Sequence, residues 1–265
     1  NWALWAILIA VTAWALVILG TIDDIRPLRW WIKLVCEFII AGSALPFVFK
    51  SLNMNPHPLV IVMAVVFIVL LTNGLNIVDV ADGLAGTIGI CSSLGLFASM
   101  LILPVGSTVF MAPLILSAVL LGFLIFNWQP ASIYLGDGGS LPLGYVAGVM
   151  IIIFITSGSQ IFNRLLISFS LVSPVLFEIA LVCFHRIKNR QLPFRGSPDH
   201  FALRLSKIGW KAPAIALSVI GVYVLLWASL GIAYLKPVFS YTYVAIVAVF
   251  YLTCFVLLSG IKVRE

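Results

Sequence analysis

Adjacent Asp23 and Asp24 are the first residues in this sequence whose type and spacing could do chemistry. They follow directly on an apolar run, in Thr21-Ile22-Asp23-Asp24. Neighbouring carboxylates repel each other, and both are unfavourable near a bilayer, so a cation that neutralises them would explain the pair. The alternative is a helix cap, because a helix N-terminus stabilises negative charge.

A second segment repeats a polar residue at every third position. It contains Asn73, Asn76, Asp79 and Asp82, and Gly83 follows. If these residues continue one helix, each lies beside the next, and together they form a slanted ridge of amides and carboxylates. The glycine would let a ligand approach the backbone closely. The alternative is a polar seam that joins neighbouring membrane helices.

The third segment places a single acid, Asp137, among glycines at 136–139, after Asn127 and Tyr134. A carboxylate in this setting suits a hard cation, while the backbone N–H groups of a helix N-terminus suit phosphate oxygens. A simple helix cap is the alternative interpretation.

The fourth segment is the basic stretch at about 185–212, where His200 stands beside Asp199. A histidine next to a carboxylate suits phosphate contact or proton transfer. A solvated loop on anionic lipid is the alternative. Together, the four segments supply metal-binding carboxylates, basic phosphate donors and a glycine-lined approach, which are the requirements of phosphoryl transfer.

The elements that must position these segments are membrane-spanning helices. The sequence is 63% hydrophobic and 9% charged, with a mean hydropathy of +1.19, which excludes an ordinary soluble domain. Lipid offers the backbone no hydrogen bonds, so apolar runs of about 20 residues must be helical, and we predict an all-α, polytopic bundle. Nine runs are found, at 1–20, 34–49, 58–73, 87–103, 111–127, 141–156, 164–184, 213–235 and 241–261. The sequence begins at Asn1 inside the first run, so we expect one catalytic domain over 1–265 that lacks upstream helices.

Basic residues predict the orientation of this bundle. With nine crossings, 12 of the 15 basic residues fall on one side, at 21–33, 185–212 and 262–265. By the positive-inside rule this side is cytoplasmic. Seven of the nine carboxylates lie on the same side. The net charge of +6 therefore needs no nucleic-acid partner to explain it.

The four segments, in this order, resemble the polyprenyl-phosphate N-acetylhexosamine-1-phosphate transferases. This family includes the phospho-MurNAc-pentapeptide translocases and the enzymes that start O-antigen and teichoic-acid lipid carriers. The resemblance runs from Asp23 to about Arg204. Three positions depart from the family pattern: Glu37 stands where Gln is usual, Val80 replaces a glycine, and His200 is the survivor of a histidine-rich motif.

The resemblance implies transfer of a sugar 1-phosphate from a UDP-N-acetylhexosamine to undecaprenyl or another polyprenyl phosphate, with release of UMP. We expect GlcNAc-1-phosphate, Mg²⁺ (with Mn²⁺ as an alternative), a bacterial plasma membrane and an active site on the cytoplasmic face. Asp137 would bind the metal, and Asp23 or Asp24 would deprotonate or orient the lipid phosphate. The residues expected to bind substrate are Lys33, Asn73, Asn76, Asp79, Asp82, Asn127, Tyr134 and His200. The family's larger number of spans implies that two upstream helices are missing, and a homodimer is left open.

Three alternatives remain at this point. The first is the phospho-MurNAc-pentapeptide transferase branch, although its motif is a run of histidines. The second is a transporter of an anionic solute, which predicts acids near the midplane and inverted repeats. The third is a CDP-alcohol phosphatidyltransferase, whose Asp-Gly-x-x-Ala-Arg pattern is not matched around Asp82.

Overall fold

The computed structural model describes residues 2–51, 53–105, 109–193, 196–235 and 239–263. Four charged residues of the topology prediction, Arg195, Lys236, Arg264 and Glu265, lie outside this part. The described residues form ten helices and no strand, which confirms the predicted all-α bundle. The helices are α1 (Trp2–Ile25), α2 (Trp30–Ser51), α3 (Pro58–Val78), α4 (Leu84–Ile102), α5 (Ala112–Asn127), α6 (Gly136–Thr156), α7 (Ile161–Lys188), α8 (Phe201–Lys207), α9 (Ala212–Leu235) and α10 (Phe239–Ser259).

Each of the nine predicted apolar runs corresponds to one long helix. Among the described residues, eight helices are long and apolar enough to cross a membrane, whereas α5, with 16 residues, is shorter. The run predicted at 34–49 is part of the 22-residue helix α2, because Trp30 and Lys33 also belong to it. The short helix α8 was not predicted, since seven residues give too little periodicity to detect.

Glycines bring together the helices that carry the candidate site. A Cβ on Gly144 of α6 would lie 2.5 Å from the Leu71 carbonyl oxygen of α3. A Cβ on Gly20 of α1 would collide with the backbone of Asp137 at the start of α6. Small residues permit such close backbone approach between membrane helices. The backbones of α1, α3 and α6 therefore fix the site from three sides.

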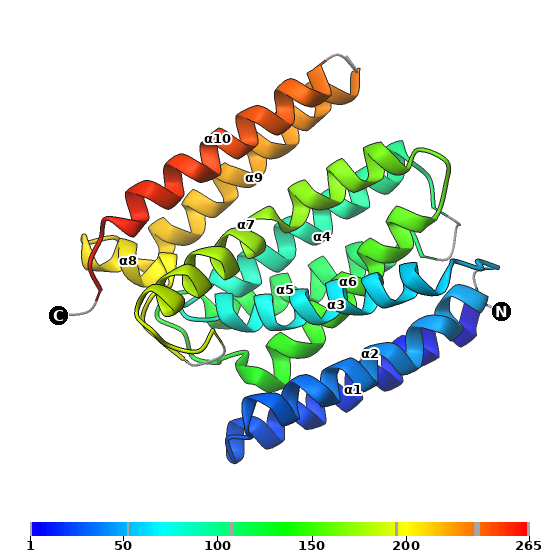
Figure 1. The fold of residues 1–265 in the computed structure, drawn as a ribbon, viewed down its shortest axis with the longest axis horizontal. Helices are drawn as coiled ribbons and strands as arrows, with labels where there is room; N and C mark the ends of the chain where they lie inside the picture. Colours follow the sequence, from blue (N-terminus) through cyan, green and yellow to red (C-terminus); the bar gives the residue numbers. More distant parts are fainter. Residues whose placement is uncertain (1, 52, 106–108, 194–195, 236–238, 264–265) are drawn as a thin grey trace.

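The bundle gathers the polar segments at one end. In Figure 1 the pair α1 and α2 lies along one side, the pair α9 and α10 lies along the other, and α3, α4, α6 and α7 fill the centre. The C-terminal ends of α1, α3 and α7 lie at the end that also carries α8. The sequence prediction that the four segments share one side of the bundle is therefore confirmed.

Candidate active site

The ammonium group of Lys33 lies between two carboxylates. Lys33 Nζ is 3.2 Å from Asp23 Oδ2 and also donates to Asp137 Oδ2. Lys33 belongs to the first turn of α2, Asp23 to the last turn of α1, and Asp137 to the first turn of α6. The three side chains are 14%, 16% and 21% exposed, so water screens their attraction only in part. Three helices thus meet at one charge cluster.

Asp24 holds the beginning of α6. Its Oδ1 accepts the Asp137 backbone N–H at 3.0 Å, and its Oδ2 accepts the Gly138 N–H at 3.0 Å. Gly136, with φ +60°, allows the close contact, because a Cβ there would lie 2.8 Å from Asp24 Oδ2. Asp24 therefore caps the N-terminus of a helix other than its own. Asp24 is thus a helix cap, which was the alternative interpretation of the Asp23–Asp24 pair, and it also lies next to Asp137.

Asn76 joins the charge cluster from α3. Its Nδ2 donates to Asp137 Oδ1 and lies 3.0 Å from Ser140 Oγ. The first of these bonds holds Asp137 Oδ1, while Lys33 binds Asp137 Oδ2. The amide thus helps to fix the orientation of the Asp137 carboxylate.

Asn73 is oriented by a buried acid. Its Nδ2 donates to Glu37 Oε2 and, at 3.0 Å, to the Val69 carbonyl oxygen. Both amide hydrogens are then engaged, so the carbonyl oxygen is the atom that Asn73 can offer a ligand. Glu37 is only 2% exposed, and its Oε1 has no hydrogen-bond partner among the described residues. In the sequence, Glu37 was noted only as a departure from the family pattern, and its hydrogen bond with Asn73 was not predicted.

The predicted helical ridge from Asn73 to Asp82 is wrong in its second half. Helix α3 ends at Val78, Asp79 is its C-cap, and Asp82 lies in the turn before α4. A helix C-terminus disfavours carboxylates, and Gly83 adopts a left-handed backbone with φ +75° that starts a new helix. The two asparagines therefore lie on a helix, whereas the two aspartates lie on a turn.

Asp79 is close to the same cluster of charges. Burial, together with the negative charges of Asp137 and Asp24, raises the pKa of Asp79 to about 6. A hydrogen bond from the Gly136 backbone N–H opposes this shift. Its carboxyl thus faces a site already rich in negative charge, where a cation would favour its ionised form.

Asp82 and Asn127 connect two turns. Asp82 Oδ2 accepts the Ala131 N–H at 3.1 Å, and Asn127 Oδ1 accepts the Gly83 N–H at 3.0 Å. Asn127 Nδ2 donates to the Ile133 carbonyl oxygen at 2.8 Å. In this structure both side chains fix the loops that follow α3 and α5.

His200 lies beside a second buried acid. Its Nδ1 is 2.8 Å from Glu178 Oε1, and the other oxygen of Glu178 accepts the Phe201 N–H at 3.1 Å. Asp199, its neighbour, contacts Arg204 at 3.3 Å instead. Sequence reasoning did not find Glu178, because it lies 22 residues away from His200 within an apolar run.

A cavity of about 410 Å³ links the asparagines and Lys33 to the His200 segment. Lys33, Asn73, Asn76, Arg186 and His200 contribute its polar lining. Its apolar lining includes Leu34, Leu70, Ile77 and Val80. Arg186 was counted only as a topology signal in the sequence, and here its Nε donates to Ser197 Oγ at 2.9 Å. The cavity therefore suits a ligand that has both anionic and apolar parts.

Seven predicted site residues are absent from the described lining of this cavity. Asp23, Asp24, Asp79 and Asp137 belong to the charge cluster beside it, whereas Asp82, Asn127 and Tyr134 belong to neither. Tyr134 is 74% exposed, so its ring is free to stack on a ligand outside the cavity. Its predicted contact with substrate, like those of the other two residues, stays a prediction.

The donor set near Asp137 fits Mg²⁺ in one specific way. No group of three or more His, Cys, Asp or Glu side chains in the described ranges forms a metal cage. Mg²⁺ is usually held by one or two carboxylates together with water and substrate phosphates, so such a cage is not required. Lys33 already occupies the space between Asp23 and Asp137 as a cation. Asp137 would hold the metal, and phosphate oxygens of a substrate would complete its ligands.

Comparison with known proteins gives a family match and several relatives. Residues 6–155 match the family described as "Glycosyl transferase family 4". A "Phospho-N-acetylmuramoyl-pentapeptide-transferase" of Kosmotoga olearia is 31% identical over 79% of this chain and 69% of its own length. A protein of Bacillus subtilis described as "Probable undecaprenyl-phosphate N-acetylglucosaminyl 1-phosphate transferase" is 28% identical over 76% of this chain and 58% of its own. A pentapeptide transferase of Campylobacter jejuni is 33% identical over 67% of this chain and 56% of its own. The chain thus spans between about half and two thirds of these relatives, which belong to both branches considered above.

Proposed function

The chain belongs to glycosyl transferase family 4, as its four segments predicted, and from this premise we propose that it transfers a sugar 1-phosphate from a UDP-sugar to a polyprenyl phosphate. The observation that supports the proposal best is the Asp23–Lys33–Asp137 cluster beside a cavity with both polar and apolar walls. A polyprenyl phosphate has both a hydrocarbon chain and an anionic head. The cavity offers apolar side chains to the first and Lys33 and Arg186 to the second.

In the proposed reaction, a phosphate oxygen of the lipid attacks the phosphorus that carries the sugar. The new P–O bond forms as the bond to the UMP oxygen breaks, and UMP leaves with that electron pair. Lys33 would stabilise negative charge on the phosphates. When bound, Mg²⁺ would supply further charge stabilisation at the donor pyrophosphate.

The two aspartates of α1 have different tasks in this proposal. Both carboxylate oxygens of Asp24 accept backbone N–H groups of α6, so Asp24 acts as a positioning residue for Asp137. Asp23 shares Lys33 with Asp137 and is the better candidate to orient or deprotonate the lipid phosphate. Asn76, with Asp79 in the turn that follows α3, would bind the UDP-sugar.

We propose UDP-GlcNAc as the donor. Its support is the Pro198-Asp199-His200 segment, where one histidine stands in place of the histidine run of the pentapeptide branch. His200 is buried against Glu178, so the segment offers a single imidazole to the cavity. The product would be the first lipid intermediate of a cell-envelope polysaccharide. The charge distribution supports placing this end of the bundle at the cytoplasmic face of a plasma membrane.

Release of UMP by the purified protein tests this proposal. We expect UMP from UDP-GlcNAc only when polyprenyl phosphate and Mg²⁺ are both present. UDP-MurNAc-pentapeptide, supplied in parallel, should give at most a small fraction of that rate. Turnover of the pentapeptide donor alone would overturn the choice of sugar but leave the reaction class intact. Equal UMP release without the lipid would overturn the reaction class.

A further inference from the structure

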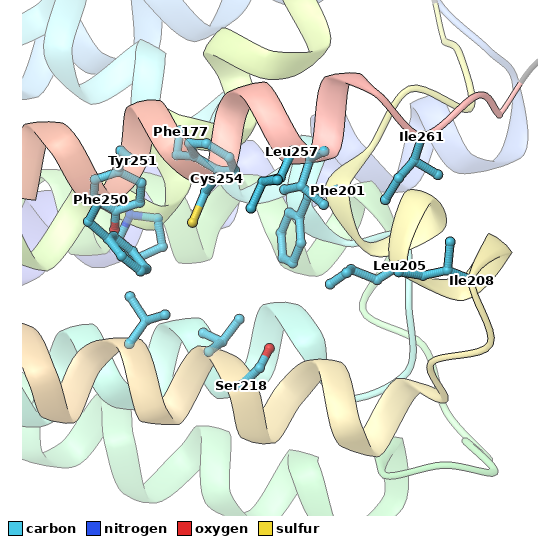
Figure 2. Close-up of a pocket in the computed structure, with 14 residues that line it drawn as sticks. Phe177, Phe201, Leu205, Ile208, Ser218, Phe250, Tyr251, Cys254, Leu257 and Ile261 are labelled. Atoms are coloured by element: carbon cyan, nitrogen blue, oxygen red, sulfur yellow. The ribbon is translucent and has the colours of Figure 1, made fainter.

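A second cavity, of about 390 Å³, lies among α7, α8, α9 and α10 (Figure 2). Its lining is mostly apolar and includes Phe177, Phe201, Leu205 and Phe250. The two hydroxyl groups on its wall are already engaged. Ser218 Oγ donates to the Ile215 carbonyl oxygen at 2.7 Å, and the hydroxyl of Tyr251 pairs with Ser173 Oγ at 2.9 Å. A ligand of this cavity must therefore be hydrocarbon, because a polar group would lose its hydrogen bonds there.

The cavity reaches the outer surface of the bundle. On its rim, Leu257 of α10 is 67% exposed and Ile208, directly after α8, is 56% exposed. Three of the lining helices, α7, α9 and α10, are candidate membrane spans, so this surface faces the bilayer. The hydrocarbon available there is a lipid chain.

Three lysines lie close in sequence to residues that line the α8 end of the cavity. Lys207 precedes Ile208, Lys262 follows Ile261, and both of these apolar residues line the cavity. Lys211 follows closely at the start of α9, and all three lysines are exposed. Within the described part of the chain, none of the three forms a salt bridge. Such lysines attract the phosphate of an anionic lipid at the membrane surface.

We propose that this cavity binds one acyl chain of an anionic phospholipid, whose phosphate lies against Lys207, Lys211 and Lys262. This site goes beyond the proposed transferase reaction. Polyprenyl phosphate is the competing occupant, but Lys33, which would bind its phosphate in the proposed reaction, does not line this cavity.

The lipid site shares a wall with the active-site cavity. Phe201 lines the lipid cavity, and its neighbour His200 lines the other. Glu178 binds the His200 ring and the Phe201 backbone with its two oxygens. An acyl chain packed against Phe201 would therefore support the position of His200.

Native mass spectrometry of the full chain in detergent tests the lipid site without any turnover. We expect phosphatidylglycerol to bind more tightly than phosphatidylcholine with the same chains, and each lysine changed to Gln to weaken it about fivefold. Ser218→Phe, which places a ring in the cavity, should abolish the preference. Leu225→Phe adds the same ring on the exposed surface of α9 and should leave binding unchanged.

Cys254→Phe fills the cavity from α10 and replaces Ser218→Phe if that variant does not fold. Equal binding of phosphatidylglycerol to the filled and wild-type proteins would overturn the proposal. Displacement of phosphatidylglycerol by an equimolar amount of polyprenyl phosphate would overturn the choice of occupant. Because no sugar donor is present, these results are independent of whether the transferase proposal holds.

Discussion

Replacing Lys33 by Met should show how much the positive charge in the Asp23–Lys33–Asp137 cluster contributes to the stability of the protein. The substitution keeps most of the side-chain volume but leaves Asp23 and Asp137 without their shared cation. Removing one partner from a mostly buried ion pair destabilises a protein by about 3–5 kcal/mol. For a chain of this size, the midpoint of thermal unfolding should fall by at least about 6 °C.

The assay is thermal unfolding of the purified protein in detergent, with and without Mg²⁺. We expect Mg²⁺ to raise the midpoint of Lys33→Met more than that of the wild type, since a divalent cation can replace the lost charge. Lys33→Arg should keep most of the stability. Lys50→Met is the matched control, because Lys50 is exposed at the end of α2 and has no salt bridge within the described ranges. A midpoint for Lys33→Met within about 1 °C of the wild type would refute the reasoning.

Three further predictions concern single side chains. Asp79→Asn should stabilise the protein by up to about 3 kcal/mol above pH 7, because the raised pKa of about 6 makes ionisation of Asp79 unfavourable in the folded state. This gain in stability should vanish as the pH falls through 6 towards 4. Unfolding midpoints measured across this pH range test the prediction. Glu37→Leu should raise KM for the UDP-sugar about tenfold by releasing Asn73, whereas Glu37→Gln, which keeps an acceptor, should stay close to the wild type in steady-state kinetics. Tyr134→Ala should raise KM about fivefold or more through lost stacking without changing the unfolding midpoint, and Tyr134→Phe should restore it.

Much of the fold follows from the sequence because lipid leaves the backbone few choices. Apolar runs of sufficient length must be helical, so the nine runs and their shared polar end could be predicted. The boundaries were less accurate: the predicted run began at 34, after the charge of Lys33, whereas helix α2 begins at Trp30 and continues through that lysine. The turn at Asp79–Gly83 was missed because the threefold spacing of polar residues continues through it, although α3 ends at Val78 and the left-handed Gly83 precedes α4.

The residue types of the site could also be predicted, but its pairings could not. Contacts such as Glu37 with Asn73 and Glu178 with His200 depend on how helices rotate and pack against each other. One sequence contains no direct signal for that rotation. The sequence predicted a separate role for each of Asp23, Lys33 and Asp137. In the structure, Lys33 contacts both aspartates.

The most direct test of the central claim is the mass of the lipid product formed by the purified protein from UDP-GlcNAc and polyprenyl phosphate in Mg²⁺. The wild type should add one GlcNAc phosphate unit to the lipid phosphate, giving a pyrophosphate-linked product together with UMP. Asp137→Asn, with its folding checked by thermal unfolding, should form none. Wild-type levels of product from folded Asp137→Asn would contradict the account of the site, and the absence of any sugar-bearing lipid from the wild type would contradict the proposed reaction.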